Sequence, residues 1–169
     1  MRLHSARITA LGMVLLLGSA SVIAAQREML GATPEEIIDR LGPPESVYSA
    51  DSPAADVRAV VFFYDDYRYF YFYDNRVWQV RLDERSDHEV EGFVPERTTD
   101  ADADADDRQR FVAPGDNRRA LFNAFGSPVL DDGESLVFDL EDRGYPVRLR
   151  AFVDEQYRIV DMYLYRADF

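Results

Sequence analysis

Two stretches of this chain, 84 residues apart, follow one pattern: a glycine, a short amphipathic helix, and a second glycine shortly before a proline. The first stretch runs from Gly31 to Pro44 and the second from Gly115 to Pro128. Their apolar positions coincide, so that Ile37, Ile38 and Leu41 match Leu121, Phe122 and Phe125. A pattern that recurs at a fixed offset predicts two copies of one structural unit.

Signals for the start and the end of a helix bound both stretches. Thr33 is a favourable N-cap, Pro34 suits the first helical position, and Glu36 stands where a capping box needs a carboxylate. Asn117 is the corresponding N-cap of the second stretch. The glycine after each helix ends it, since glycine readily adopts the left-handed conformation. We therefore expect one short helix in each stretch.

Three segments rich in aromatic and β-branched residues follow each expected helix. They are residues 58–64, 68–73 and 76–82, then 135–140, 147–153 and 158–165. The sequence therefore predicts an α+β fold of two tandem repeats, each a short helix followed by a three-stranded antiparallel meander. Because one repeat alone would bury little surface, we expect the two sheets to pack edge to edge or face to face and share a core.

Residues 1–25 have the features of a secretory signal peptide. A positively charged start precedes an apolar core at residues 8–17, and Ala24 and Ala25 offer small residues for cleavage. An uncleaved membrane anchor is the alternative, because an apolar segment of about 18 residues just spans a bilayer. We therefore expect a periplasmic or extracellular bacterial protein, which would contact a membrane only through this segment if it is retained.

The rest of the chain divides into three parts. Residues 26–83 form the expected first repeat, residues 84–110 an acidic linker, and residues 111–169 the second repeat. Alternating Asp and Ala at 100–107 bury nothing and repel one another, so we expect an extended, solvated linker. An EF-hand loop beginning at Asp100 or at Asp102 would lack its required glycine and glutamate, and no metal site is predicted.

Composition excludes several classes of function. The formal charge of −13, from 32 acidic and 19 basic residues, opposes nucleic-acid binding because the phosphates would repel it. The chain has no cysteine, which excludes disulfides, thiol catalysis, thiolate metal sites and a lipid-modified N-terminal cysteine. Every basic residue is arginine, so there is no lysine for a Walker motif or a Schiff base. No cofactor is predicted.

The helix signature, Gly-x-Thr leading into a short helix that ends Leu-Gly-x-Pro, together with the aromatic meander after it, resembles a known superfamily. Over residues 31–82 and 115–165 the chain is similar to the small lipoprotein of the outer-membrane β-barrel assembly machinery and to the tandem-repeat β-lactamase inhibitor proteins. The resemblance implies non-enzymatic binding in the cell envelope, and the inhibitor proteins present an aromatic-lined concave sheet to a partner protein. The chain departs from both, because it lacks the lipid-bearing cysteine of the one and the disulfides of the other. No functional residue is transferred.

The most unusual segment is residues 64–73, Tyr-Asp-Asp-Tyr-Arg-Tyr-Phe-Tyr-Phe-Tyr. Alternate side chains of a strand point to opposite faces, so Phe70 and Phe72 should pack on the helix. The other face would carry a row of tyrosines, which the last strand would extend if the two sheets are continuous. These predicted partner-binding residues are Tyr67, Tyr69, Tyr71, Tyr73, Tyr163 and Tyr165. Such rings suit protein binding or stacking on glycans, unless the second repeat covers them as part of the core.

Trp78 is expected to be a core residue that shares a strand face with Val80 and Leu82. Four arginines could bind a carboxylate or a phosphate, or could instead neutralise the surrounding acids. They are Arg118, Arg119, Arg148 and Arg150.

Catalysis has little support in the sequence. His88, the only histidine outside the signal peptide, could serve a hydrolase only with a serine and an aspartate adjacent in space, and carboxylate pairs arise by chance among 32 acids. We therefore predict no catalytic residue and an exported, non-enzymatic protein-binding module of the bacterial cell envelope. Its aromatic sheet face would be the binding surface, with acidic rims that steer a basic partner. The alternatives are a glycan- or peptidoglycan-binding module and a carboxylate-dependent hydrolase.

Overall fold

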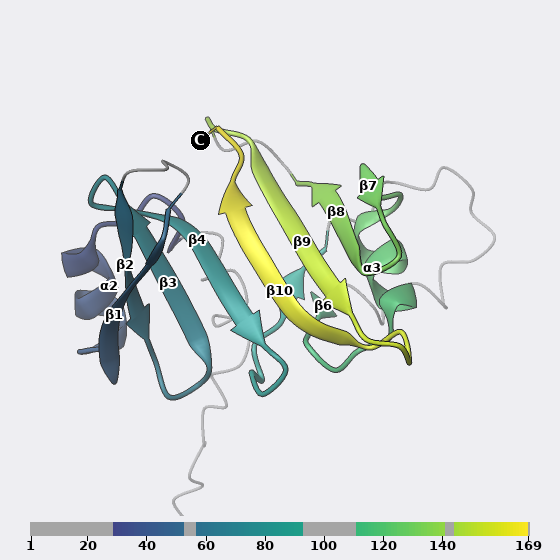
Figure 1. Ribbon diagram of the computed structural model, residues 1–169, viewed down its shortest axis with the longest axis horizontal. Helices are drawn as coiled ribbons and strands as arrows, with labels where there is room; N and C mark the ends of the chain where they lie inside the picture. Colours follow the sequence, from purple (N-terminus) through teal and green to yellow (C-terminus); the bar gives the residue numbers. More distant parts are fainter. Residues whose placement is uncertain (1–28, 53–56, 93–110, 141–143, 169) are drawn as a thin grey trace, which may run out of the picture.

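The computed structural model describes residues 29–52, 57–92, 111–140 and 144–168. These residues form an α+β fold, as predicted, in which one eight-stranded antiparallel sheet carries two short helices (Figure 1). The predicted signal peptide and most of the predicted acidic linker lie outside the described residues. Within the described ranges, no helix is long and apolar enough to cross a membrane.

The strands of the sheet follow the order β1-β2-β3-β4-β10-β9-β8-β7, and β5 pairs with β6 in a separate two-stranded ribbon. The elements are α2 (Pro34–Leu41), β1 (Ser46–Asp51), β2 (Arg58–Phe63), β3 (Arg68–Tyr73), β4 (Arg76–Asp83), β5 (Val90–Glu91), β6 (Phe111–Val112), α3 (Arg118–Phe125), β7 (Leu130–Asp131), β8 (Ser135–Asp139), β9 (Val147–Val153) and β10 (Ile159–Arg166).

The sheet is continuous because β4 pairs with β10 at its centre. Leu82 lies opposite Met162 and Val80 opposite Leu164, so the strands that follow α2 join the strands that follow α3 edge to edge. Of the two arrangements expected from the sequence, the structure has this one. Pairing the two inner edges leaves β1 and β7 as the outer strands of the sheet.

Each helix is followed by four strands, so the prediction of a three-stranded meander was wrong in its count. Six of the eight strands of the large sheet correspond to predicted segments, and the two additional strands of that sheet are β1 and β7. Strand β1 alternates only weakly between apolar and polar residues, and β7 has two residues, so neither has a local signal of its own. The β3–β4 turn has the expected geometry, with positive φ at Asp74 and Asn75.

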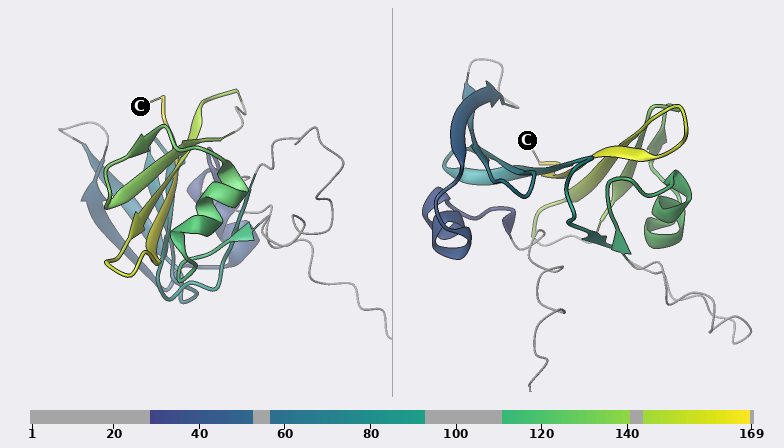
Figure 2. Two further views of the ribbon diagram at one scale, coloured as in Figure 1. Left: turned by 90° about the vertical axis from the view of Figure 1, so that its right-hand side faces the viewer. Right: turned by 90° about the horizontal axis from the view of Figure 1, so that it is seen from below.

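Both helices begin as their caps predict. Thr33 and Glu36 form the capping box of α2, and the side chain of Asn117 accepts a hydrogen bond from the amide of residue 119. The two helices lie on the same side of the sheet (Figure 2). Ile38 and Phe122, which occupy matching apolar positions of the two helices, are both exposed. Instead, α2 packs on the sheet through Ile37 and α3 through Leu121, and both side chains are fully buried.

The core consists of two clusters, and each contains side chains from both halves of the sheet. The cluster beneath α2 contains Ile37 and Phe70 together with Val147 of β9 and Leu164 of β10. The cluster beneath α3 contains Leu82 of β4. Since neither half closes its core alone, the expectation of a shared core is met.

The start of the predicted linker is part of the fold. Val90 of β5 pairs with Val112 of β6 and is buried in the cluster beneath α3. Gly92 lies so close to α3 that a Cβ placed on it would be 2.4 Å from the carbonyl oxygen of Ala124. Ser86, Val90 and Gly92 are thus buried in the fold, whereas Glu84, Arg85 and Asp87 of the same segment are exposed. Residues 93–110 lie outside the described part of the chain.

Candidate functional site

The two faces of the sheet differ. Both helices pack on one face, and on the other the sheet is concave, since β1 and β2 curl away from the helices at one end and the β9–β10 hairpin rises at the other (Figure 2). We call this second surface the open face. The side chains on it that matter here are Phe63, Tyr69, Tyr71, Tyr73, Trp78, Gln79, Arg81, Arg150, Phe152, Tyr163 and Tyr165.

Five of the six predicted tyrosines lie on the open face. Those of β3 alternate with Phe70 and Phe72, which are buried on the helix side as predicted. Those of β10 continue the face, because Tyr163 lies opposite Arg81 and the edge-to-edge pairing keeps the second half from covering β3. Tyr67 is the exception. It lies in the β2–β3 turn with φ of 61°, and its ring packs beneath the guanidinium of Arg85.

A row of stacked side chains crosses the open face from β2 to β9. The ring centroids of Phe63 and Tyr69 are 4.9 Å apart, and those of Tyr163 and Phe152 are 5.7 Å apart. Between these pairs the guanidinium carbon of Arg81 lies 5.1 Å from the Tyr69 ring centroid and 5.7 Å from that of Tyr163. Contacts of this geometry are favourable both between rings and between a guanidinium and a ring. These contacts pack the side chains of the row against one another.

Arg81 is fixed in this row by a carboxylate from the other half of the sheet. Its Nε and Nη2 donate to the two oxygens of Asp161 at 2.8 and 3.1 Å. Burial would lower the pKa of Arg81, but the hydrogen bonds and the charge of Asp161 outweigh burial and raise that pKa above its ordinary value. The pair joins β4 to β10 at the seam, and a bidentate pair holds one geometry.

Tyr69 has a structural role in addition to its place in the row. Its hydroxyl donates to Oδ2 of the buried Asp83 at 3.0 Å. Burial, together with this carboxylate, raises the pKa of Tyr69 to about 12. Burial also raises the pKa of Asp83, but the hydrogen bonds from Arg85 and Tyr69 outweigh it and hold that pKa below its usual value. Replacing Tyr69 would leave a buried carboxylate with one donor fewer, so binding tests should use other tyrosines.

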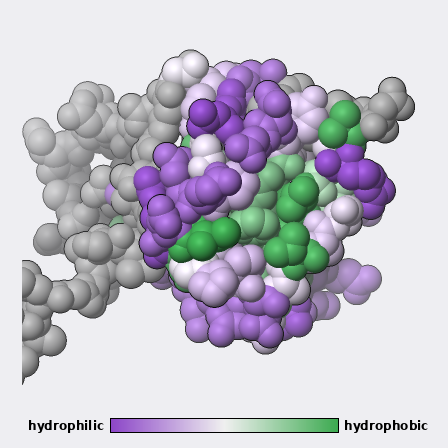
Figure 3. Space-filling view, turned by 90° about the vertical axis from the view of Figure 1, so that its left-hand side faces the viewer, coloured by the Kyte–Doolittle hydropathy of each residue, from purple (hydrophilic) through white to green (hydrophobic). Residues whose placement is uncertain are grey.

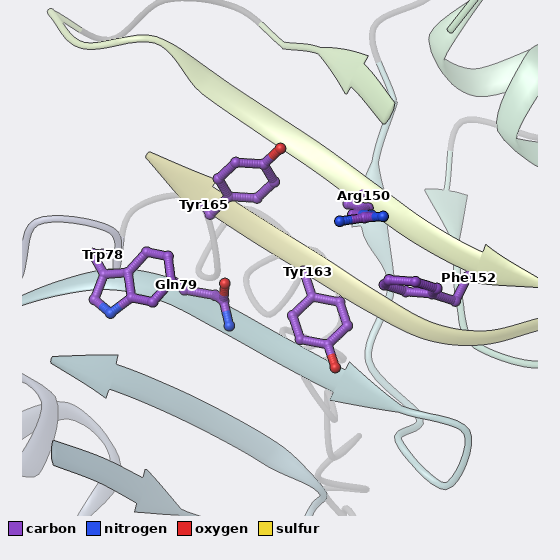
Figure 4. A pocket seen from close by; sticks show the side chains of 6 residues that line it. All are labelled: Trp78, Gln79, Arg150, Phe152, Tyr163 and Tyr165. Atoms are coloured by element: carbon purple, nitrogen blue, oxygen red, sulfur yellow. The ribbon is translucent and has the colours of Figure 1, made fainter. Parts of the chain in front are cut away.

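Trp78 lies on the open face, and its assignment to the core was wrong. A β-bulge between β3 and β4 shifts the register after Tyr71, so that Val77 is fully buried while Trp78 and Gln79 stand on the other face. The edge of the indole packs against the Tyr71 ring, with centroids 6.3 Å apart. The indole nitrogen is buried without a hydrogen-bond partner, and it lies on the β3 side of the ring (Figure 4). Strict alternation along β4 could not reveal this placement.

A pocket of about 330 Å³ opens between β4, β10 and β9 (Figure 4). It is lined by Trp78, Gln79, Arg150, Phe152, Tyr163 and Tyr165. A second pocket of about 430 Å³ shares two of these side chains, Trp78 and Tyr165, and is also lined by Arg148 and Arg166. The open face thus has a hollow with aromatic walls and arginines on one side.

The four arginines singled out in the sequence have different surroundings. Arg118 pairs with Asp131 at 2.6 Å, and Arg148 pairs with Asp139 at 2.7 Å. These two arginines therefore neutralise neighbouring acids, which is the second of the two roles considered for them in the sequence. Arg119 lies exposed on α3, whereas the guanidinium of Arg150 lines the first pocket and donates to the hydroxyl of Ser135.

His88 does not form a catalytic set with its neighbours. Its Nε2 lies 3.0 Å from Oδ2 of Asp66, an oxygen that also pairs with Arg68. The Ser86 hydroxyl donates to the backbone carbonyl of Asp66, so it is not placed to pass its proton to the imidazole. Within the described residues, no group of three or more acidic or histidine side chains could hold a metal ion.

A separate apolar area lies at the outer edge of the sheet. Around β1, the side chains of Ile38, Val47, Val57 and Val60 are exposed. Figure 3 shows apolar surface gathered in the middle of this side of the molecule. It differs from the open face in having few aromatic rings, and among the described residues no strand pairs with the outer edge of β1.

Comparisons with known proteins give little further information. No family model matches the chain, and no curated protein matches it. A structural match is the 1.5 Å crystal structure of an extracellular protein containing an SCP domain from Bacillus anthracis strain Ames, with a TM-score of 0.47 and 11% identity. The match covers 94% of this chain and 50% of that one, so this chain spans about half the length of that protein.

Proposed function

We propose that this chain is an exported, non-enzymatic module of the bacterial cell envelope that binds a partner protein through its open face. The observation that carries the proposal is the gathering of Trp78 and five tyrosines on a concave sheet surface that no described element covers. The signal-like residues 1–25 support export. The surroundings of His88 support a role other than catalysis.

We further propose that the two halves are copies of one unit, related to the helix-plus-meander superfamily of the assembly-machinery lipoprotein and the β-lactamase inhibitor proteins. A capped helix followed by four antiparallel strands occurs twice in the chain, which supports the repeat. The interpretation of residues 26–83 and 111–169 as the two repeats stays a prediction.

The composition of the open face matches that of known protein interfaces. Tyrosine, tryptophan and arginine are the side chains that contribute most to binding energy at such surfaces, above all where they are held rigidly. Here Arg81 is clamped by Asp161 and stacked between two rings, so little side-chain entropy remains to be lost on binding.

The test is affinity capture from native envelope with the tagged full chain, its Tyr165→Ser variant and a matched Tyr157→Ser control. Tyr165 lines both pockets of the open face, whereas Tyr157 is an exposed tyrosine in the β9–β10 turn. We expect a stoichiometric protein partner with the wild type and the control, and its loss with Tyr165→Ser at an unchanged melting temperature. Capture that Tyr165→Ser leaves intact would contradict the proposal.

Glycan binding is the second candidate, and the first pocket is the observation that favours it. Aromatic walls formed by Trp78 and Tyr165, beside the amide of Gln79, are suited to stacking on a sugar ring and bonding its hydroxyls. Co-sedimentation with purified cell-wall material distinguishes the two functions. A protein-binding module stays in the supernatant, whereas a glycan-binding module sediments and is released by Trp78→Ala.

A further inference from the structure

Arg150 differs from the other arginines on its side of the open face. Arg81, Arg148 and Arg166 each pair with a carboxylate, those of Asp161, Asp139 and Asp168. Arg150 lines the first pocket, and among the described residues the carboxylate of Asp132 reaches it through Ser135 rather than in a direct ion pair. Its guanidinium carbon lies over the Phe152 ring, 4.7 Å from the ring centroid.

The position of Arg150 is set by a relay of hydrogen bonds that runs from the exposed Asp132 through the buried Ser135. Ser135 is fully buried, and its hydroxyl donates to Oδ2 of Asp132 at 3.1 Å while its amide donates to Oδ1 at 2.7 Å. The same hydroxyl accepts from Nε and Nη2 of Arg150 at 3.3 and 3.1 Å. A guanidinium has five N–H donors, so about three of them stay available for a ligand. The guanidinium is therefore fixed in place and still has donors to offer.

The surroundings define what would bind there. Figure 4 shows the guanidinium on the same side of the sheet as Tyr165, Tyr163 and Phe152, so a ligand meets aromatic walls and one planar cation together. A carboxylate matches the donor geometry of a guanidinium, and the methylene groups of an acidic side chain pack well against rings. A cation in a partly enclosed pocket also favours a ligand of opposite charge.

We propose that this pocket binds one aspartate or glutamate side chain of the protein partner, with Arg150 as its anchor. The inference rests on the proposed protein-binding function and names the chemistry of the contact. The chain carries a net charge of −13, so a broadly acidic partner would be repelled at long range. The fitting partner surface is therefore basic or neutral overall and carries a single acidic side chain at its centre.

The test selects peptides from a random library displayed on phage against the full chain. Each selected peptide is then resynthesised with its acidic residues replaced by the amides. Binding is followed by the fluorescence of Trp78, which is the only tryptophan of the chain and lines the pocket. Four variants are compared with the wild type: Arg150→Gln, Ser135→Ala, Tyr165→Ser, and Arg119→Gln as an exposed-arginine control on the helix side.

We expect the neutral peptides to bind the wild type and Arg119→Gln about tenfold or more weakly than the acidic ones, as for a lost charge-assisted hydrogen bond. Against Arg150→Gln the acidic and neutral peptides should bind alike. Ser135→Ala should reduce the preference for acidic over neutral peptides although Arg150 keeps its charge. This result would show that the placement of the guanidinium matters in addition to its charge.

Two results would overturn the inference, and they are distinguishable. Peptides that lose binding with Tyr165→Ser but show no preference for an acidic side chain would leave the proposed function intact and remove the carboxylate site. If no selected peptide depends on Tyr165 at all, both the proposed function and the inference fail. If Arg150→Gln has a lower melting temperature than the wild type, Arg150→Lys replaces it. This variant keeps the charge but cannot bond the serine and a carboxylate in the same planar geometry.

Discussion

Shortening Leu164 to alanine tests whether the two halves of the sheet form one cooperative unit. Leu164 belongs to β10, yet its side chain, only 3% exposed, packs in the cluster beneath α2. Replacing such a leucine by alanine typically costs about 2–5 kcal/mol, because the lost contacts add to the free energy of the cavity left behind. At about 2–4 °C per kcal/mol for a chain of this size, a loss of roughly 3 kcal/mol lowers the melting temperature by about 6–12 °C.

The measurement follows urea unfolding with two probes at once. Far-UV circular dichroism reports on all strands, whereas the fluorescence of Trp78 reports on β4 in the other half of the sheet. In a shared core, the substitution in β10 should move both transitions to the same lower midpoint with the slope unchanged. Leu130→Ala is the matched control, because this leucine of β7 is 49% exposed and its shortening should change stability by less than about 0.5 kcal/mol.

The result that refutes the reasoning is a Trp78 transition that stays at the wild-type midpoint while circular dichroism shows an earlier step. The halves would then unfold independently, and the continuity of the sheet at β4–β10 would contribute little free energy. A loss below about 1 kcal/mol in both probes would equally refute it, since a leucine so deeply buried cannot be shortened at that cost.

Two further predictions concern Tyr69 on the open face and Val47 at the outer edge of the sheet. The raised pKa of Tyr69 means that its neutral hydroxyl is favoured in the folded state, so its contribution to stability is complete below pH 10 and is lost as the pH rises through about 12. The informative quantity is the difference between the spectrophotometric titrations of the wild type and Tyr69→Phe, because the chain has ten tyrosines. This difference should show a step near pH 12, and a difference step near pH 10 would contradict the assignment. At the outer edge, Val47 of β1 is 57% exposed beside a strand edge with which no described strand pairs, so Val47→Lys should reduce concentration-dependent light scattering without changing the melting temperature. Equal scattering by the two proteins would show that this edge does not associate.

Local signals in the sequence were sufficient for the parts of the fold that depend on local chemistry. The N-caps Thr33 and Asn117 and the turn at Asp74-Asn75 act within a few residues of the chain, so their pattern can be read directly. The central strands were predictable as well, because each carries a dense run of aromatic and β-branched residues in its own sequence. Strands β1 and β7 depend on a neighbouring strand for their pairing, and the burial of Val90 depends on a helix more than 25 residues away.

The candidate site divides in the same way. Alternation along β3 placed Tyr69, Tyr71 and Tyr73 on one face, because nothing interrupts the pleat there. It failed for Trp78, since a bulge is a property of two paired strands and leaves no mark in one of them. The relay from Asp132 through Ser135 to Arg150 was equally hidden, because the register that brings β8 against β9 decides it.

The side chains of the open face also cover the side of the sheet on which no described helix lies. Small apolar residues on that face, Ala59 and Val61, are fully buried, although no described helix lies over them. Long side chains stand above the sheet on that face, and in the row that crosses it the guanidinium of Arg81, paired with Asp161, lies between the rings of Tyr69 and Tyr163. Such side chains shield the backbone with their flat apolar parts while their polar ends stay hydrated. A binding surface needs the same combination, apolar enough to bury and polar enough to remain exposed without a partner, and so one layer can serve both the stability of the sheet and the recognition that we propose.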